Sequence, residues 1–200
     1  MYIFATNNPG KAKEIAVVFN DAGLELYSLA DLGLTLSPNE TGRTYEENAI
    51  IKATETAAFL QTRGYKGITV FADDSGFEVD AFDGLPGVDS ALYMGAETPC
   101  NVRNAEIIKL LEGNENRAAK FITVIACILP CGEILTTRGE LSGTVSHEPR
   151  GAAGFGYDPI LYIPALEKTV AELTTEQKNS ISHRVKAFAV MLKILTEKKE

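Results

Sequence analysis

The sequence predicts an α/β protein with a mixed sheet, because short apolar segments alternate with segments of helical periodicity. Residues 2–5 are apolar enough for a strand, and residues 13–22 repeat apolar side chains at helical spacing. Residues 68–72 form a second apolar, β-branched segment after a long helical stretch. Alternation of this kind is typical of α/β folds, in which helices cover a sheet.

Capping signals locate the first two helices. Asn8 predicts an N-cap and Pro9 a first helical residue, and Gly23 predicts where that helix ends. The second helix is expected to begin at Thr44, where the sequence TYEE forms a capping box, and to end at Gly64.

The second half of the chain predicts a hairpin between two further helices. Residues 121–129 and 134–137 are strand candidates separated by the turn sequence PCGE, and so short a connection allows only an antiparallel pair. Residues 139–145 are expected to extend the second strand. Helices are expected over residues 103–112 and 182–195.

The composition fits a single domain over residues 1–200. Hydrophobic residues make up 45% of the chain and charged residues 23%, which is enough apolar mass for one sizeable core. The formal net charge of −8 argues against a broad basic surface, so polymeric nucleic acid is not an expected partner. No apolar run approaches the ~18 residues of a membrane span, so no membrane partner is expected.

The cysteines and the first residues of the chain indicate the cellular compartment of the protein. Cys100, Cys127 and Cys131 form neither an even disulfide framework nor a CxxC pair, and their apolar neighbours predict reduced thiols in the core. The chain enters an apolar strand directly, without the basic segment of a secretory signal. We therefore expect a cytoplasmic protein.

The sequence TNNPGK, residues 6–11, has the pattern of an anion site. It joins a strand to a helix N-terminus, where free N–H groups and the positive end of the helix dipole attract phosphate. Lys11 would add a positive charge. The pattern is not a Walker A loop, because the first glycine is missing and Ala12 replaces the hydroxyl that binds Mg²⁺. A well-capped helix without a ligand explains the same residues equally well.

Two adjacent carboxylates, Asp73 and Asp74, follow the strand of residues 68–72 and precede Ser-Gly. Strand ends present catalytic groups in α/β proteins, and paired acids suit a metal ion or a proton transfer. Because successive strand residues point to opposite faces, the two acids are expected to differ in role. A solvated turn is the alternative, since Asp, Ser and Gly favour turns.

Glu40, Asn48 and Lys52 form another polar group. Asn48 and Lys52 lie four positions apart, on one face of the second helix. Glu40 precedes TGRT in a loop from which a carboxylate can reach a metal ion. A solvated helix face accounts for Asn48 and Lys52 equally well.

Two segments near the C-terminus suit a nucleotide base. The glycine-rich sequence RGAAGFGYDPI carries Phe155 and Tyr157, where a ring can stack on a base while the backbone approaches closely. The alternative is a tight turn before a strand, with Tyr157 in the core. The sequence KNSISHR supplies donors to phosphate or to a base carbonyl from Lys178, His183 and Arg184.

Six segments occur in order along the chain: TNNPGK, ETGRTYEENAIIKA, ADDSGFEVDA, GLPGVDSA, GFGYDPI and SHR. Taken together they make the chain resemble the Ham1-like family of inosine triphosphate pyrophosphatases, also called non-canonical purine NTP pyrophosphatases. The similarity runs from Thr6 to Arg184. Each motif is weak alone, but six in one order are highly specific.

The resemblance implies Mg²⁺-dependent hydrolysis of ITP, dITP or XTP to the monophosphate and pyrophosphate, which cleanses the nucleotide pool. It also implies an elongated, two-lobed α/β domain with a long twisted mixed β-sheet flanked by helices and a cleft between the lobes. The expected assembly is a homodimer.

The resemblance further implies roles for individual residues. Asp74 is the implied catalytic proton acceptor, Glu40 and Asp74 are the implied Mg²⁺ ligands, and Asp73 is assigned to metal support. The implied substrate-binding residues are Thr6, Asn7, Asn8, Pro9, Gly10, Lys11, Ser75, Phe155, Gly156, Tyr157, Asp158, Lys178, His183 and Arg184.

The chain differs from the family pattern at one position, and two other functions are alternatives to this interpretation. Members of the family often read SARY where this chain has SALY, so Leu92 replaces an arginine, which concerns the homodimer more than the chemistry. A nucleotide-binding regulator without catalysis is one alternative. Loss of catalysis usually shows in the acids, however, and Glu40, Asp73 and Asp74 are all present. The other alternative is a pyrophosphatase for modified pyrimidines or methylated bases. Such an enzyme would not need the donor set of Lys178, His183 and Arg184.

Overall fold

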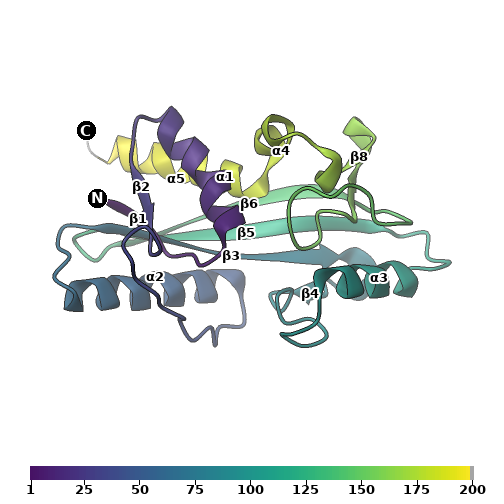
Figure 1. The fold of residues 1–200 in the computed structure, drawn as a ribbon, viewed down its shortest axis with the longest axis horizontal. Coiled ribbons are helices and arrows are strands. Elements are labelled where there is room, and N and C mark those ends of the chain that lie inside the picture. Colours follow the sequence, from purple (N-terminus) through teal and green to yellow (C-terminus); the bar gives the residue numbers. More distant parts are fainter. Residues whose placement is uncertain (199–200) are drawn as a thin grey trace. The chain divides into compact units, whose positions relative to one another are not determined.

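The structure is a computed structural model that describes residues 1–198 (Figure 1). Its strands are β1 (Tyr2–Phe4), β2 (Leu26–Ser28), β3 (Thr69–Val79), β4 (Pro86–Gly87), β5 (Ala118–Ile128), β6 (Ile134–Val145), β7 (Leu161–Ile163) and β8 (Lys168–Thr169). Its α-helices are α1 (Pro9–Asp21), α2 (Tyr45–Thr62), α3 (Cys100–Leu110), α4 (Thr175–Ile181) and α5 (His183–Glu197). Short 3₁₀ helices occupy Asp80–Phe82, Pro164–Leu166 and Val170–Glu172. Within residues 1–198, no helix combines the length and apolar character that crossing a membrane requires.

The strands form one mixed sheet in the order β2-β1-β3-β5-β6-β7-β8, with β4 paired to β3. β1 is parallel to both β2 and β3, whereas β4 is antiparallel to β3, and β7 is antiparallel to β6 and β8. The predicted fold class, α/β with a mixed sheet flanked by helices, is therefore confirmed.

The chain divides into two compact units. Unit 1 consists of Met1–Asp74, Thr123–Gly139 and Arg184–Glu200, and unit 2 consists of Ser75–Ile122 and Glu140–His183. Neither unit is a continuous segment, because β3, β5 and β6 each contribute residues to both. The single domain expected from the composition stays a prediction.

An aromatic cluster forms the core of unit 1. The rings of Phe4, Phe19, Phe71 and Phe188 come from β1, α1, β3 and α5, and neighbouring centroids lie 5.3 to 5.9 Å apart. Within this unit α1 and α5 lie on one face of the sheet and α2 lies on the other (Figure 1). The buried side of α2 includes the small residues Ala49, Ala53 and Ala57.

The capping signals of the first two helices are confirmed. Oδ1 of Asn8 accepts hydrogen bonds from the backbone N–H groups of Gly10 at 2.9 Å and Lys11 at 3.2 Å, and Pro9 is the first helical residue. Thr44 and Glu47 form the predicted capping box of α2. These local contacts fix where α1 begins, and therefore where Lys11 lies.

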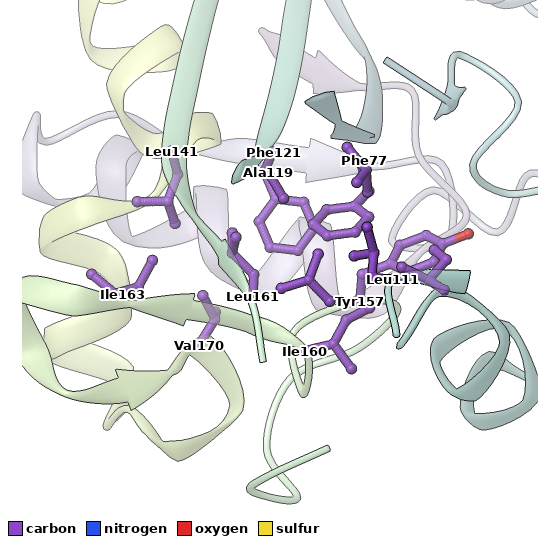
Figure 2. Close-up of a cluster of buried hydrophobic side chains, with 13 residues drawn as sticks. Phe77, Leu111, Ala119, Phe121, Leu141, Tyr157, Ile160, Leu161, Ile163 and Val170 are labelled. Atoms are coloured by element: carbon purple, nitrogen blue, oxygen red, sulfur yellow. The ribbon is translucent and has the colours of Figure 1, made fainter. Parts of the chain in front are cut away.

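Thirteen buried side chains form the core of unit 2, among them Phe77, Phe121 and Tyr157 (Figure 2). Tyr157 stacks on Phe77 with ring centroids 4.9 Å apart, and its hydroxyl donates to the carbonyl of Ser90 at 2.8 Å. Burial raises the pKa of Tyr157 to about 12, so the phenol stays protonated near neutral pH. Of the two positions considered for Tyr157, against a base or in the core, the structure shows the core position.

β3 is longer than the sequence predicted, and this changes the setting of the acids. The predicted strand stopped at residue 72, but β3 continues to Val79, so Asp73 and Asp74 lie inside the strand and are buried. The solvated turn considered for this pair is wrong. Each carboxylate meets cationic side chains, which allows the strand to continue through two charged residues.

The predicted burial of all three cysteines is wrong for two of them. Cys127 is buried in β5, and burial raises the pKa of its thiol to about 12. Cys100 and Cys131 are exposed, because Cys100 begins α3 and Cys131 lies in the turn between β5 and β6. No cysteine of the chain is in a disulfide, as predicted.

Phe188→Ala should destabilise the protein strongly, because it leaves a hole among the aromatic rings of unit 1. The expected loss in free energy of unfolding is about 3–5 kcal/mol, measured by urea denaturation. Val190→Ala is the matched control, since Val190 lies on the same helix but is 50% exposed, and it should cost less than about 0.5 kcal/mol. Equal losses in the two variants would contradict this account of the core.

Candidate active site

The loop of residues 6–11 joins β1 to the N-terminus of α1. Oγ1 of Thr6 accepts from the backbone N–H of Asn8 at 3.1 Å, and Nδ2 of Asn7 donates to the carbonyl of Leu36 at 2.9 Å. The loop also lines a pocket of about 820 Å³ with side chains of α1, β2 and residues 30–35. These contacts hold the predicted anion loop in one conformation.

A buried ionic network connects α1, β3 and α5 in unit 1. Oδ2 of Asp73 lies 2.8 Å from Nζ of Lys11 and 3.1 Å from Nε of Arg184. Nη1 of Arg184 lies 2.8 Å from Oε2 of Glu14. Arg184 and Asp73 are each only 2% exposed, so these charges interact with little screening by water.

The network explains the ionisation of Asp73. Burial opposes the charged carboxylate, but the positive charges of Lys11 and Arg184 outweigh it and hold the pKa of Asp73 well below its usual range. Burial lowers the pKa of Lys11, and Asp73 counteracts that shift only in part. Asp73 is therefore a fixed anion that places the Lys11 ammonium at the start of α1.

Asp74 has a separate set of partners on the other face of the strand. Nζ of Lys52 lies 2.9 Å from Oδ1 of Asp74 and 2.7 Å from Oε2 of Glu40. Nδ2 of Asn48 lies 3.5 Å from Oδ2 of Asp74, while Oδ1 of Asn48 accepts from the backbone N–H of Gly42 at 2.8 Å. The solvated face considered for Asn48 and Lys52 is wrong, since both side chains are buried against β3.

The two adjacent acids differ in ionisation as well as in direction. Burial raises the pKa of Asp74, and the attraction of Lys52 offsets this only in part. Asp73 interacts with two cations of its own, whereas Asp74 shares one ammonium with Glu40. A carboxyl group with a raised pKa is the better proton acceptor of the two.

The carboxylates of Glu40 and Asp74 suit a hard cation. Both offer oxygen atoms, which Mg²⁺ prefers, and both already face one positive group, the ammonium of Lys52. Asp73 is directed instead at Lys11 and Arg184. Among residues 1–198, no three His, Cys, Asp or Glu side chains gather as a ready metal site.

A second polar group lies in unit 2, around the glycine-rich loop. Oδ2 of Asp158 accepts from the backbone N–H of Phe155 at 2.9 Å and from Nζ of Lys178 at 2.8 Å. The same ammonium lies 4.8 Å from the centroid of the Phe155 ring. Nδ2 of Asn104 donates to the carbonyl of Gly156 at 3.1 Å, which ties the loop to α3.

This conformation of the loop requires glycine at position 154. Its φ is +79°, and a Cβ placed there would lie 2.0 Å from Oδ2 of Asp158. The Asp158 carboxylate therefore occupies the space that a side chain at position 154 would need. This packing fixes both the loop and Lys178.

The structure divides the predicted site residues between the two units. Unit 1 holds the anion loop, Glu40, Asp73, Asp74 and Arg184. Unit 2 holds Ser75, which is half-buried, the loop of residues 155–158, Lys178 and His183, whose ring stacks on Phe121 at 5.1 Å. The roles assigned to these residues stay predictions.

Sequence reasoning missed Glu14 and Asn104 and left Asn48 and Lys52 undecided. Glu14 follows Lys11 by three positions, a spacing that puts two opposite charges on one helix face, so a signal was present. Nothing in the local sequence indicates that Asn104 reaches Gly156, which lies 52 positions away. The mixed sheet and the ion pairs define an α/β protein whose strand β3 carries two buried acids paired with lysine and arginine side chains.

Comparison with known proteins identifies the group. The model of the Ham1 family matches residues 2–194. A dITP/XTP pyrophosphatase from an Exiguobacterium species is 46% identical over 186 residues, which are 93% of this chain and 92% of that protein. A dITP/XTP pyrophosphatase from Bacillus subtilis is 41% identical and covers 96% of both chains. The chain belongs to the Ham1 family.

A solved structure supports the same grouping. The Staphylococcus aureus Ham1 protein has a TM-score of 0.84 to this chain, with 37% sequence identity over 98% of both chains. The family expected from the six motifs is therefore confirmed, and so is the mixed sheet flanked by helices that it implied.

Asp73→Asn should remove a pH-dependent part of the stability. The folded pKa of Asp73 lies below the unfolded value of about 3.9, so its charge stabilises the fold above that value and this contribution is lost as the pH falls. The variant should be about 3–5 kcal/mol less stable near neutral pH, because Lys11 and Arg184 both lose the carboxylate of Asp73. The difference should begin to shrink as the pH falls below about 5 and should keep shrinking at still lower pH, because the folded pKa lies well below the unfolded one.

Urea denaturation at several pH values measures this difference. Asp21→Asn is the control, because it makes the same chemical change at an exposed position of α1 and should cost less than about 0.5 kcal/mol. A constant difference between wild type and Asp73→Asn across the acid range would contradict the assigned role.

Proposed function

We propose that the chain is a nucleoside triphosphate pyrophosphohydrolase that converts dITP, XTP and ITP to the monophosphate and pyrophosphate. The main support is the acid pair on β3, in which Asp73 is paired with Lys11 and Arg184 while its neighbour Asp74 is paired with Lys52. The relatives from Exiguobacterium and Bacillus subtilis carry the name dITP/XTP pyrophosphatase. Removing such nucleotides keeps them out of nucleic acid.

The reaction replaces one phosphoanhydride bond by a bond to water. The water oxygen forms a bond to phosphorus, the bond from phosphorus to the oxygen between the α- and β-phosphates breaks, and pyrophosphate leaves. Asp74 accepts the proton that the water loses. Its carboxylate lies 2.9 Å from the ammonium of Lys52, which also contacts Glu40, so the position of the proton acceptor is fixed.

We propose Mg²⁺ as the cofactor, held by Glu40 and Asp74. When bound, Mg²⁺ would neutralise charge on the phosphate oxygens and lower the pKa of a bound water. Asp73 would support this site indirectly by holding Lys11 in place, since its own carboxylate is paired with two cations.

The phosphates are assigned to the loop of residues 6–11. Backbone N–H groups at the start of α1 and the ammonium of Lys11 carry the positive charge there. Lys11 interacts with Asp73 and stands beside the helix N-terminus, so an incoming anion finds a cation that is already positioned. Ser75 is the further predicted contact to the nucleotide.

The base is assigned to residues 155–158 with Lys178 and His183, which all belong to unit 2, whereas Arg184 is buried in unit 1 against Asp73 and Glu14. Lys178 lies over the Phe155 ring and is held by Asp158, so it can donate to a carbonyl oxygen of a purine. Tyr157 supports the loop from the core rather than offering its ring to a base.

We further propose a homodimer in the cytoplasm. Leu85, Leu92, Met94 and Val102 are exposed apolar side chains that lie close together in the sequence of unit 2. Leu92, which replaces the arginine common in the family, would lie at the interface. Free thiols agree with a reducing compartment.

Asp74→Asn should abolish the release of pyrophosphate from dITP while the protein stays folded. Loss of general-base catalysis alone lowers kcat by ~10²–10⁴-fold, and the amide is also a poorer metal ligand. Pyrophosphate release is measured by a coupled assay and the fold by circular dichroism. Asp21→Asn should keep full activity, and a folded Asp74→Asn protein with wild-type kcat would refute the proton-acceptor role.

Assays with a panel of nucleoside triphosphates test the proposed specificity. ITP, dITP and XTP present an oxygen at position 6 of the base, whereas ATP presents an amino group there and would meet the Lys178 ammonium donor against donor. We expect kcat/KM for dITP and XTP to exceed that for ATP by about 10⁴, with GTP between them. Equal hydrolysis of ATP and dITP, or release of orthophosphate, would contradict the proposed function.

A further inference from the structure

The ammonium group of Lys52 is shared by two carboxylates. Its Nζ lies 2.7 Å from Oε2 of Glu40 and 2.9 Å from Oδ1 of Asp74. Lys52 and Asp74 are buried, and only Glu40 is exposed. One positive charge therefore faces two negative charges in a position that water reaches mainly from the side of Glu40.

The surrounding backbone keeps Lys52 in this position. Lys52 lies one helical turn after Asn48 on α2, and Asn48 accepts from the backbone N–H of Gly42 in the loop that carries Glu40. A Cβ on Gly42 would lie 2.7 Å from Oδ1 of Asn48 and 2.9 Å from its backbone nitrogen. The loop is thus packed directly on α2, and Glu40 is brought to Lys52 by contacts that do not involve Lys52 itself.

The same two carboxylates are the proposed Mg²⁺ ligands. Mg²⁺ needs oxygen ligands at about 2.0–2.1 Å in near-octahedral geometry. An ammonium group within hydrogen-bond distance of these oxygens occupies part of that space and repels a divalent cation. It also compensates the negative charge that would otherwise attract one.

We propose that Lys52 is the internal counter-ion of Glu40 and Asp74 and that it lowers the affinity of the nucleotide-free protein for divalent cations. This inference rests on the proposed function for the identity of the metal-binding acids. A divalent cation reaches the acids when the ammonium moves away, and an anion that takes over the ammonium favours that movement. A triphosphate is such an anion, so metal and nucleotide bind cooperatively.

A purely structural ion pair is the alternative. In that case Lys52 would stabilise the packing of α2 against β3, and its removal would lower the free energy of unfolding without strengthening metal binding. The two accounts therefore differ in the sign of one measurable quantity, the change in metal affinity when the charge of Lys52 is removed.

The experiment measures Mn²⁺ binding to the nucleotide-free protein by electron paramagnetic resonance of free Mn²⁺. Wild type is compared with Lys52→Gln and Lys52→Met. Both variants should bind Mn²⁺ at least about tenfold more tightly, because two carboxylates lose their internal cation while the oxygen ligands remain. Mg²⁺ should compete for the same site.

Three further variants control for charge and position. Lys52→Arg keeps the charge and should bind Mn²⁺ as weakly as wild type. Lys11→Met removes a half-buried lysine paired with Asp73, and Lys198→Met removes an exposed one paired with Glu133, so neither should tighten binding about tenfold. Equal tightening in Lys11→Met, or no tightening in either neutral variant of Lys52, would overturn the inference.

The experiment still gives a result if one variant misfolds or if the proposed function is wrong. Lys52→Gln keeps an N–H donor toward the carboxylates, so it decides the result if circular dichroism shows that Lys52→Met does not fold. Because the assay contains no nucleotide, tighter Mn²⁺ binding in Lys52→Gln with no pyrophosphate release by wild type would refute the function and support the role of Lys52. An active wild type with unchanged Mn²⁺ affinity in Lys52→Gln would refute the role of Lys52 alone.

Discussion

The buried ion pair between Arg184 and Asp73 is the interaction on which unit 1 depends. It joins the first turn of α5 to the middle of β3, and Glu14 and Lys11 extend it to α1. Burying the charges of Glu14, Asp73 and Arg184 costs desolvation energy, which is offset only when each charge has a partner. Asp73 holds α5 through Arg184 and also pairs with Lys11 of the anion loop, so one carboxylate contributes to both the fold and the site.

The alternation of side chains along β3 gives two adjacent residues of the same type different chemistry. Asp73 is paired with cations of α1 and α5, which keep it ionised, and Asp74 is paired with Lys52 of α2, a cation that it shares with Glu40. Burial acts on both carboxylates in the same direction, and the number of nearby cations decides the net shift. A strand can therefore carry a fixed anion and a proton acceptor side by side without a turn between them.

Local signals predicted much of the fold but little of the site geometry. The Asn8 cap, the Thr44 capping box and the turn between β5 and β6 depend on residues a few positions apart, and all were predicted. The continuation of β3 through Asp73 could not be, because Lys11 and Arg184 lie far from it in sequence. Helical spacing showed that Asn48 and Lys52 share a face of α2 but not that β3 lies against it.

The position of Arg184 in the chain has a consequence for protein synthesis. Arg184 follows Asp73 by 111 residues and Glu14 by 170, so both acids leave the ribosome long before their cation is made. At translation rates of about 5–20 residues per second, they wait several seconds or more without it. Unit 1 cannot complete its core before α5 has been made, and a nascent chain that stops short of α5 leaves uncovered the apolar rings that Phe188 contacts, a kind of surface that chaperones recognise.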